Sequence, residues 1–137
     1  MIPKFRVWDT VKKAMSEVQA IVYTEENVYP IYFKKIRRYI PFSEAILMQS
    51  TGLLDKNGKE IFESDIVKTT IFFGRADESG GFYEYEKELI GIVKQLEGAW
   101  VIDTEKGAVY LWSDINENEV LGNIWENPKL LEEIKDE

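Results

Sequence analysis

Four carboxylates near the middle of the chain have a spacing that could do chemistry: Asp55, Glu60, Glu63 and Asp65. Carboxylate oxygens can hold a divalent cation, and a pair of carboxylates can share acid and base roles in hydrolysis. The spacing does not fit an EF-hand loop, because Gly58 follows Asp55 too early. We therefore expect a turn in which Asp55 bonds the nearby backbone while the acids face water. A metal or hydrolase site near Asp65 is the alternative.

A second group, between positions 32 and 39, interleaves bases with aromatic rings: it includes Lys34, Lys35, Arg37, Arg38 and Tyr39. Such a segment can hold single-stranded nucleic acid through phosphate contacts and base stacking. It can equally dock on an acidic protein surface, and residues 114–137 supply one, with eight acidic and two basic residues. A solvated edge strand that its bases protect from aggregation is the simplest interpretation. We place protein contact or self-contact ahead of nucleic acid.

Two residue types are missing from the sequence, which contains no His and no Cys. This excludes disulfides, histidine or cysteine catalysis, a Ser-His-Asp triad and the usual zinc ligands. The net charge of −8 is uneven, since residues 1–41 carry +4 and residues 42–137 carry −12. Phosphate repels so acidic a body, which disfavours nucleic acid as a partner. We predict no catalytic residue, no metal and no cofactor.

The elements that position these groups are predicted to be antiparallel strands. Segments rich in β-branched and aromatic residues alternate with turn signals about every ten residues, as in a barrel or sandwich. Strands are predicted over residues 4–8, 15–23, 45–51, 65–73, 82–95, 99–103, 108–112 and 119–125, with an extended edge segment over 28–42. A helix over residues 11–20 is the alternative for the second strand. Asn127-Pro128 is typical of a helix start.

We therefore predict one all-β (β-dominant) domain over residues 1–137, barrel-like, with seven to nine antiparallel strands and a short C-terminal helix. Asn57-Gly58 is a strong hairpin signal, and Gly52 is expected to break the strand before it. Residues 74–81 are predicted to be a loop and the best candidate for a mobile tip. Trp112 is expected at a rim, and the other three tryptophans in or beside the core.

No segment predicts export or membrane insertion. The first residues lack the apolar stretch of a signal peptide. No apolar run approaches the roughly 20 residues of a membrane span. We expect a soluble protein of the cytoplasm with no membrane partner.

Four segments resemble the YopX family of small phage and prophage proteins: KFRVWD (4–9), LMQSTGLLDKNGKEIFESDIV (47–67), GIVKQLEGAWVI (91–102) and VLGNIWENPKLL (120–131). The resemblance covers a little under half of the chain. It implies a mostly β, barrel-like fold and an origin in a phage or prophage. It implies no established activity and supplies no site residues. The family favours glycine before the Asp-Ile-Val run, where this chain has Ser64; if that glycine serves a positive φ, Ser64 must bear strain or the turn must differ.

These observations predict a phage or prophage accessory protein of the host-cell cytoplasm that acts by binding and is not an enzyme. The expected partners are further copies of the chain, in a homo-oligomer, or a host or phage protein. One alternative is a nucleic-acid-associated protein that uses residues 32–39. The other is a carboxylate-dependent metal or hydrolase site near Asp65.

Overall fold

The computed structural model describes the backbone of residues 2–31, 37–76 and 78–135, and their side chains as far as residue 132. These residues form eleven strands, one short 3-10 helix and one α-helix. The elements are β1 (Phe5–Asp9), β2 (Ala14–Val22), β3 (Asn27–Pro30), β4 (Ile40–Pro41), η1 (Phe42–Glu44), β5 (Ala45–Leu54), β6 (Glu60–Phe62), β7 (Asp65–Ala76), β8 (Phe82–Leu96), β9 (Ala99–Thr104), β10 (Gly107–Tyr110), β11 (Asn116–Asn123) and α1 (Pro128–Lys135). Within the described ranges, no helix is long and apolar enough to cross a membrane.

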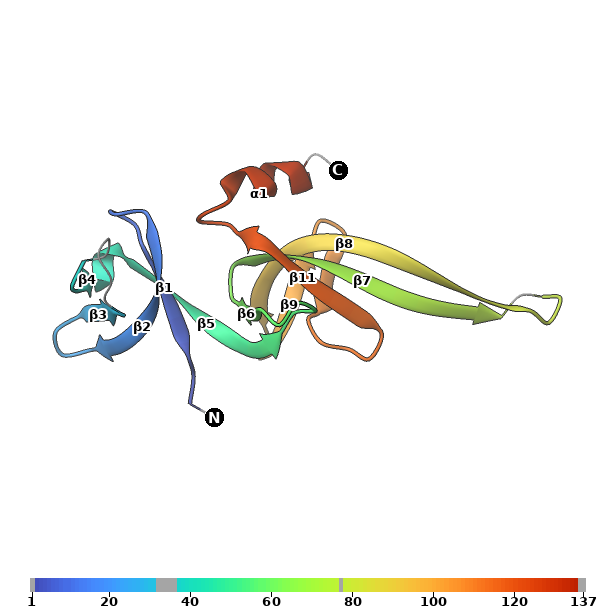
Figure 1. Ribbon diagram of the computed structural model, residues 1–137, viewed down its shortest axis with the longest axis horizontal. Coiled ribbons are helices and arrows are strands. Elements are labelled where there is room, and N and C mark those ends of the chain that lie inside the picture. The colour runs from blue at the N-terminus through green and yellow to red at the C-terminus, as the bar shows by residue number, and fades with distance from the viewer. Residues whose placement is uncertain (1, 32–36, 77, 136–137) are drawn as a thin grey trace.

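The strands form two antiparallel sheets that follow one another along the long axis of the molecule (Figure 1). The first sheet has the order β4-β3-β2-β1-β5-β6, and the second has the order β10-β9-β8-β7-β11. The predicted all-β class and the short C-terminal helix are confirmed. The barrel-like closure is not confirmed, because the described strands leave edges at β4 and β6 in one sheet and at β10 and β11 in the other.

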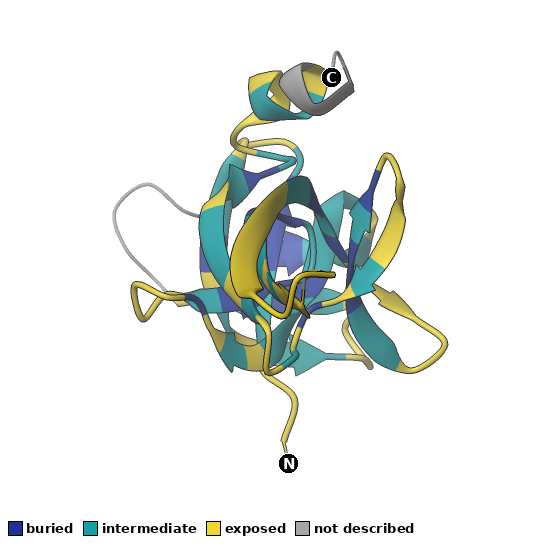
Figure 2. Cartoon of the chain, turned by 90° about the vertical axis from the view of Figure 1, so that its right-hand side faces the viewer, coloured by how far each residue is buried: buried dark blue, intermediate teal, exposed yellow. Residues whose placement is uncertain are grey.

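Two apolar clusters stabilise the sheets, and the larger one joins them. The smaller cluster lies in the first sheet and is formed by Val7, Val28 and Ile40. The larger cluster combines Ile61 of β6 with residues of the second sheet and the residue that follows β10: Val67, Val93, Ile102 and Leu111. Figure 2 shows the buried residues gathered in the middle of the molecule. Each fully buried aliphatic side chain contributes roughly 1.5–3 kcal/mol, so both sheets depend on this shared core.

The hairpin between β5 and β6 has the predicted turn in a different form. Gly58 has φ +82°, whereas Asn57 keeps a negative φ, so the turn is not the type I′ turn that Asn-Gly favours. The amide of Gly58 donates to the carbonyl of Asp55 at 3.0 Å. Gly52 does not break β5 as predicted; with φ +79° it lies where the register between Ser50 and Leu54 shifts.

The strand count exceeds the prediction of seven to nine. The additional strands β3, β4 and β6 have four, two and three residues, too short for a periodic pattern to emerge. The helix alternative over residues 11–20 is wrong, because β2 covers most of that range and pairs with β1. Its apolar residues gain more from the β1 ladder than from a local helix.

Of the two outcomes expected at Ser64, a strained backbone or a different turn, the structure shows the strained backbone. Ser64 lies in the two-residue turn between β6 and β7, with φ +75°. Its amide donates to the carbonyl of Val93 at 2.9 Å, and its carbonyl accepts from the amide of Ile124 at 3.1 Å. These two hydrogen bonds join the turn to β8 and to the residue after β11, the two neighbours of β7. They keep Ser64 at a positive φ, although a residue with a Cβ atom disfavours that conformation.

We predict that Ser64→Gly raises the free energy of unfolding by about 1 kcal/mol, because glycine adopts a positive φ without the steric cost of a Cβ atom. Urea unfolding followed by Trp fluorescence measures the change. Asn57→Gly is the control: this exposed turn residue has a negative φ, so the free energy of unfolding should fall by about 0.5–1 kcal/mol. A loss of stability in Ser64→Gly would contradict the assignment of strain to Ser64.

Candidate protein-contact surface

Asp55 is buried, which corrects the expectation that the acids of the central stretch face water. Its Oδ1 atom accepts the amides of Asn57 at 2.9 Å and Lys59 at 2.8 Å, the local bonds expected of a turn. Its Oδ2 atom accepts the amide of Val120 in β11 at 2.9 Å. Burial by itself raises the pKa of Asp55, but these amides outweigh it and hold that pKa below its ordinary value. Asp55 therefore ties the hairpin turn to the second sheet.

Asp65 is also buried, and both of its oxygens are occupied. Arg6 of β1 donates from Nη2 to Asp65 Oδ1 at 2.8 Å, and the amide of Phe62 donates to Oδ2 at 2.8 Å. The Arg6 guanidinium also lies over the ring of Phe62, with its Cζ atom 4.8 Å from the centroid. Burial raises the pKa of Asp65 above its ordinary value, and Arg6 and the amide offset only part of this effect.

The two glutamates of the central stretch have separate partners. Glu60 accepts the Ser50 hydroxyl at 2.5 Å and the Lys4 ammonium at 2.9 Å. Glu63 accepts the amide of Gln49 at 3.3 Å. The described residues contain no group of three or more acidic side chains placed to hold a metal ion. Over the part of the chain that the structure describes, the geometry gives no support to the alternative of a metal site near Asp65.

The predicted basic-aromatic segment is only partly available for contact. Lys34 and Lys35 lie outside the described residues. Arg37 instead forms a two-pronged ion pair with the buried Asp9: Nε and Nη2 each lie 2.8 Å from a carboxylate oxygen. Burial by itself raises the pKa of Asp9, but Arg37 and two backbone amides outweigh it and hold that pKa below its ordinary value. Arg37 is therefore a structural residue, and its ion pair stabilises the fold until the pH falls into the range where aspartate protonates.

Arg38 and Tyr39 are exposed, as a contact surface requires. They line an open groove of about 660 Å³ together with Gln19 of β2 and with Tyr29 and Pro30 of β3; we call it the Arg38 groove. The rings of Tyr29 and Tyr39 lie 6.3 Å apart at 47°. Among the described residues Arg38 has no ion-pair partner, so the groove combines aromatic walls with a free cation.

The most exposed aromatic surface was missed by the sequence prediction. Residues 74–81 were expected to form a loop, but β7 continues to Ala76 and β8 begins at Phe82, paired with it. We call residues 72–76 and 82–88 the arm. The arm projects from the body as a two-stranded ribbon (Figure 1). None of the other described strands pairs with it, since β11 begins opposite Ile71 and β9 ends opposite Gly91.

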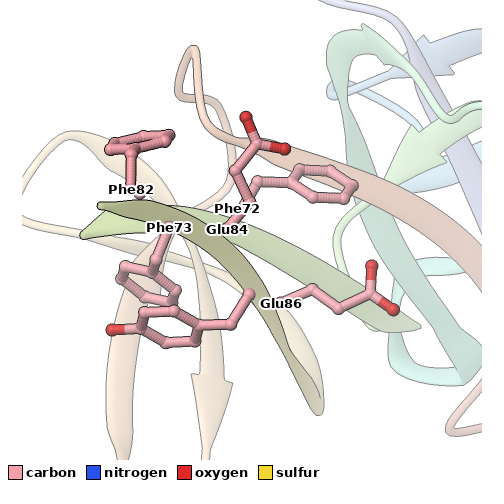
Figure 3. Close-up of a pocket in the computed structure, with 7 residues that line it drawn as sticks. Phe72, Phe73, Phe82, Glu84 and Glu86 are labelled. Carbon is pink, nitrogen blue, oxygen red and sulfur yellow. The ribbon is translucent and has the colours of Figure 1, made fainter. Parts of the chain in front are cut away.

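The two faces of the arm carry opposite charge. On one face, which we call the acidic face, cross-strand pairing puts Phe72 beside Glu86, Gly74 beside Glu84 and Ala76 beside Phe82. Glu88 lies on the same face. The other face, the basic face, carries Phe73, Arg75, Tyr83, Tyr85 and Lys87. Figure 3 shows Phe72, Phe82 and Glu84 on one side of the ribbon and Phe73 on the other. The strand itself was predicted over residues 82–95, and the alternation of Glu with Tyr in FYEYEKE is the sequence signal that could have identified its two different faces.

Large rings remain exposed on both faces of the arm. Phe82 is 69% exposed, and Phe72, Tyr83 and Tyr85 are each about half exposed. On the basic face the rings of Phe73 and Tyr85 stack with centroids 5.0 Å apart. An isolated two-stranded ribbon is marginally stable in water, and exposed apolar patches of this kind are typical of interaction sites.

The tryptophans lie where the sequence analysis placed them. Trp112 is 66% exposed. Trp8 is buried and stacks on Trp125 with centroids 6.4 Å apart, and Trp100 packs against the larger core cluster. They therefore form no shared aromatic platform for a sugar or a base.

The comparisons with known proteins agree with the resemblance seen in the sequence. A family model described as YopX protein matches residues 4–132. The chain is also similar to a solved structure, the crystal structure of protein EF1440 from Enterococcus faecalis, with a TM-score of 0.58 and 26% sequence identity. That match covers 96% of this chain and 99% of the other. No curated protein matches this chain.

We predict that Asp65→Ala lowers the free energy of unfolding by about 3–5 kcal/mol, because it leaves the Arg6 guanidinium buried without its counter-charge. The double variant Arg6→Met/Asp65→Leu should lose less than Asp65→Ala alone, since it removes both charges and fills the space. Urea unfolding measures all variants. Strictly additive losses for Arg6→Met and Asp65→Leu would show that the two side chains do not interact.

Proposed function

The chain belongs to the YopX family, and from that premise we propose that it is a phage or prophage accessory protein that acts by binding other proteins, without catalysis. Its partners are further copies of the chain or a host or phage protein, and its place of action is the cytoplasm of the host cell. The arm is the element through which it binds.

The exposed rings of the arm are the observation that carries this proposal. Phe72, Phe82, Tyr83 and Tyr85 leave large apolar surfaces in water on a ribbon that contributes no residue to either core cluster. Burying such rings against a partner is favourable by roughly 25 cal/mol per Å². Aromatic residues are also the ones that carry most of the energy in protein interfaces.

The charges of the chain favour a protein partner over nucleic acid. The net charge is −8, and Arg37, the central base of the predicted nucleic-acid segment, is occupied by Asp9. Arg75 and Lys87 on the basic face of the arm have three glutamates behind them on the acidic face of the same thin ribbon. A phosphate backbone on either face experiences both signs of charge, which weakens its binding.

We predict that Phe82→Ser/Tyr85→Ser weakens partner binding at least tenfold and lowers the free energy of unfolding by less than about 1 kcal/mol, because both rings are exposed. The wild-type chain and the variant, each tagged, are used to recover partners from prophage-carrying cells, and the recovered proteins are quantified by mass spectrometry.

Tyr110→Ser is the matched control, because Tyr110 is an equally exposed ring, at 70%, on β10 and outside the arm. It should recover the same partners as the wild type. An arm variant that keeps every partner, with Tyr110→Ser losing them, would place the binding surface at β10 and overturn the role of the arm.

A further inference from the structure

We propose that the acidic face of the arm docks in the Arg38 groove of a second copy of this chain. Phe82 enters the groove and packs against the exposed sides of the two tyrosine rings, and Glu84 and Glu86 form ion pairs with Arg38. This inference rests on the proposed function, in that the arm is the binding element, and it names the partner and the surface that the arm contacts.

The acidic face of the arm presents the Phe82 ring together with the carboxylates of Glu84 and Glu86. The Phe82 ring lies over Gly74, where a Cβ atom would be 2.5 Å from the Cζ atom of the ring. Glycine at this position lets the ring lie across the ribbon, while 69% of Phe82 stays accessible. Glu84 and Glu86 form no ion pair with any described residue, so they are available to a cation from outside the molecule.

The Arg38 groove offers the complementary chemistry. Tyr29 and Tyr39 supply ring faces and edges, which pair favourably with a phenyl ring at centroid distances of about 4.5–7 Å. Arg38 supplies a planar donor that can bind carboxylates by charge-assisted hydrogen bonds. Gln19 and Pro30 complete the lining with a neutral polar group and an apolar ring.

The position of the two surfaces requires the contact to be between molecules. The groove is formed by β2, β3 and the residues before β4, at one end of the long axis, and the arm projects at the other end (Figure 1). An arm therefore cannot reach the groove of its own chain. Since the two surfaces differ, two copies can exchange arms reciprocally, or successive copies can form a chain.

The overall charge distribution attracts the same two regions to each other. Residues 1–41 carry a net charge of +4, and residues 42–137 carry −12. Opposite potentials at the two ends of an elongated molecule orient approaching copies head to tail and speed their association. Salt screens this attraction over a distance of about 10 Å at 0.1 M.

Charge reversal at each surface tests the proposal. Multi-angle light scattering at 20 mM salt should give the wild type a mass of at least twice the 16.0 kDa of one chain, and 0.5 M salt should lower it. Arg38→Glu alone, and Glu84→Lys/Glu86→Lys alone, should each weaken self-association at least tenfold and give monomers. Lys87→Glu, on the opposite face of the arm, is the control and should assemble like the wild type.

Mixing and recombining the variants identifies the contact. The Arg38→Glu chain keeps an intact arm and the Glu84→Lys/Glu86→Lys chain keeps an intact groove, so an equimolar mixture should form a heterodimer. The reversed arm and the reversed groove also carry opposite charges in this mixture and favour the same heterodimer. The triple variant Arg38→Glu/Glu84→Lys/Glu86→Lys restores opposite charges and should assemble again. Circular dichroism and urea unfolding verify that each variant is folded.

A wild type that is monomeric at all concentrations would overturn the inference, as would Arg38→Glu that assembles normally or a mixture that stays monomeric. These results leave the proposed function standing if Phe82→Ser/Tyr85→Ser still loses a protein recovered from cells. If that variant keeps every such protein and the wild type is monomeric, both the inference and the proposed function fail.

Discussion

The buried ion pair between Arg6 and Asp65 is the interaction on which the arrangement of the two sheets depends. Arg6 lies in β1 of the first sheet, and Asp65 is the first residue of β7 in the second, with Nη2 and Oδ1 2.8 Å apart. The same carboxylate accepts the amide of Phe62, so it also holds the end of β6. Removing two charges from water is costly, and only this combination of partners compensates it. The pair therefore fixes where the chain passes from one sheet to the other.

Asp55 supports the same junction from the other side. Its bond to the amide of Val120 joins the β5–β6 turn to β11, while Ile61 of β6 packs in the core of the second sheet. The base of β7 is thus held by an ion pair, a hydrogen bond and a shared apolar cluster. Because the arm continues β7 and β8 without a break, a well-held base gives the exposed rings a defined direction. A fixed direction of the exposed rings is what a protein-binding surface requires.

The sequence predicted the features that local patterns determine and missed those that depend on distant partners. The strand signals, the Asn57-Gly58 turn and the start of α1 involve neighbouring residues, and each was found. For Asp55 only the local turn bonds were expected, and Asp65 was expected in water, because their distant partners, Val120 and Arg6, lie 65 and 59 residues away in the chain. Nothing in the local pattern distinguishes a solvated aspartate from one that bonds a distant amide.

The contact surface also combines features that the local sequence predicted with features that depend on distant partners. Arg37 and Arg38 are adjacent and chemically identical, but only the fold brings Asp9 to the first and leaves the second free. The strand predicted over residues 82–95 is confirmed by β8, but Gly74, Gly80 and Gly81 are turn signals and led to a predicted loop over residues 74–81, where β7 in fact continues to Ala76. The glycine signal was misleading at Gly74, where the glycine makes room for the Phe82 ring within the ribbon.

Hydrogen–deuterium exchange at two protein concentrations tests the central claim, that the arm is a contact surface, most directly. Backbone amides of residues 82–90 on the outer edge of β8 have no partner strand on that side, and the arm opens readily as a two-stranded ribbon. If the arm docks on a second copy, exchange in the arm and in Tyr29, Arg38 and Tyr39 slows as the concentration rises, while the β1–β2 ladder stays unchanged. Equal exchange in the arm at both concentrations, with added partner proteins having no effect, would contradict the account.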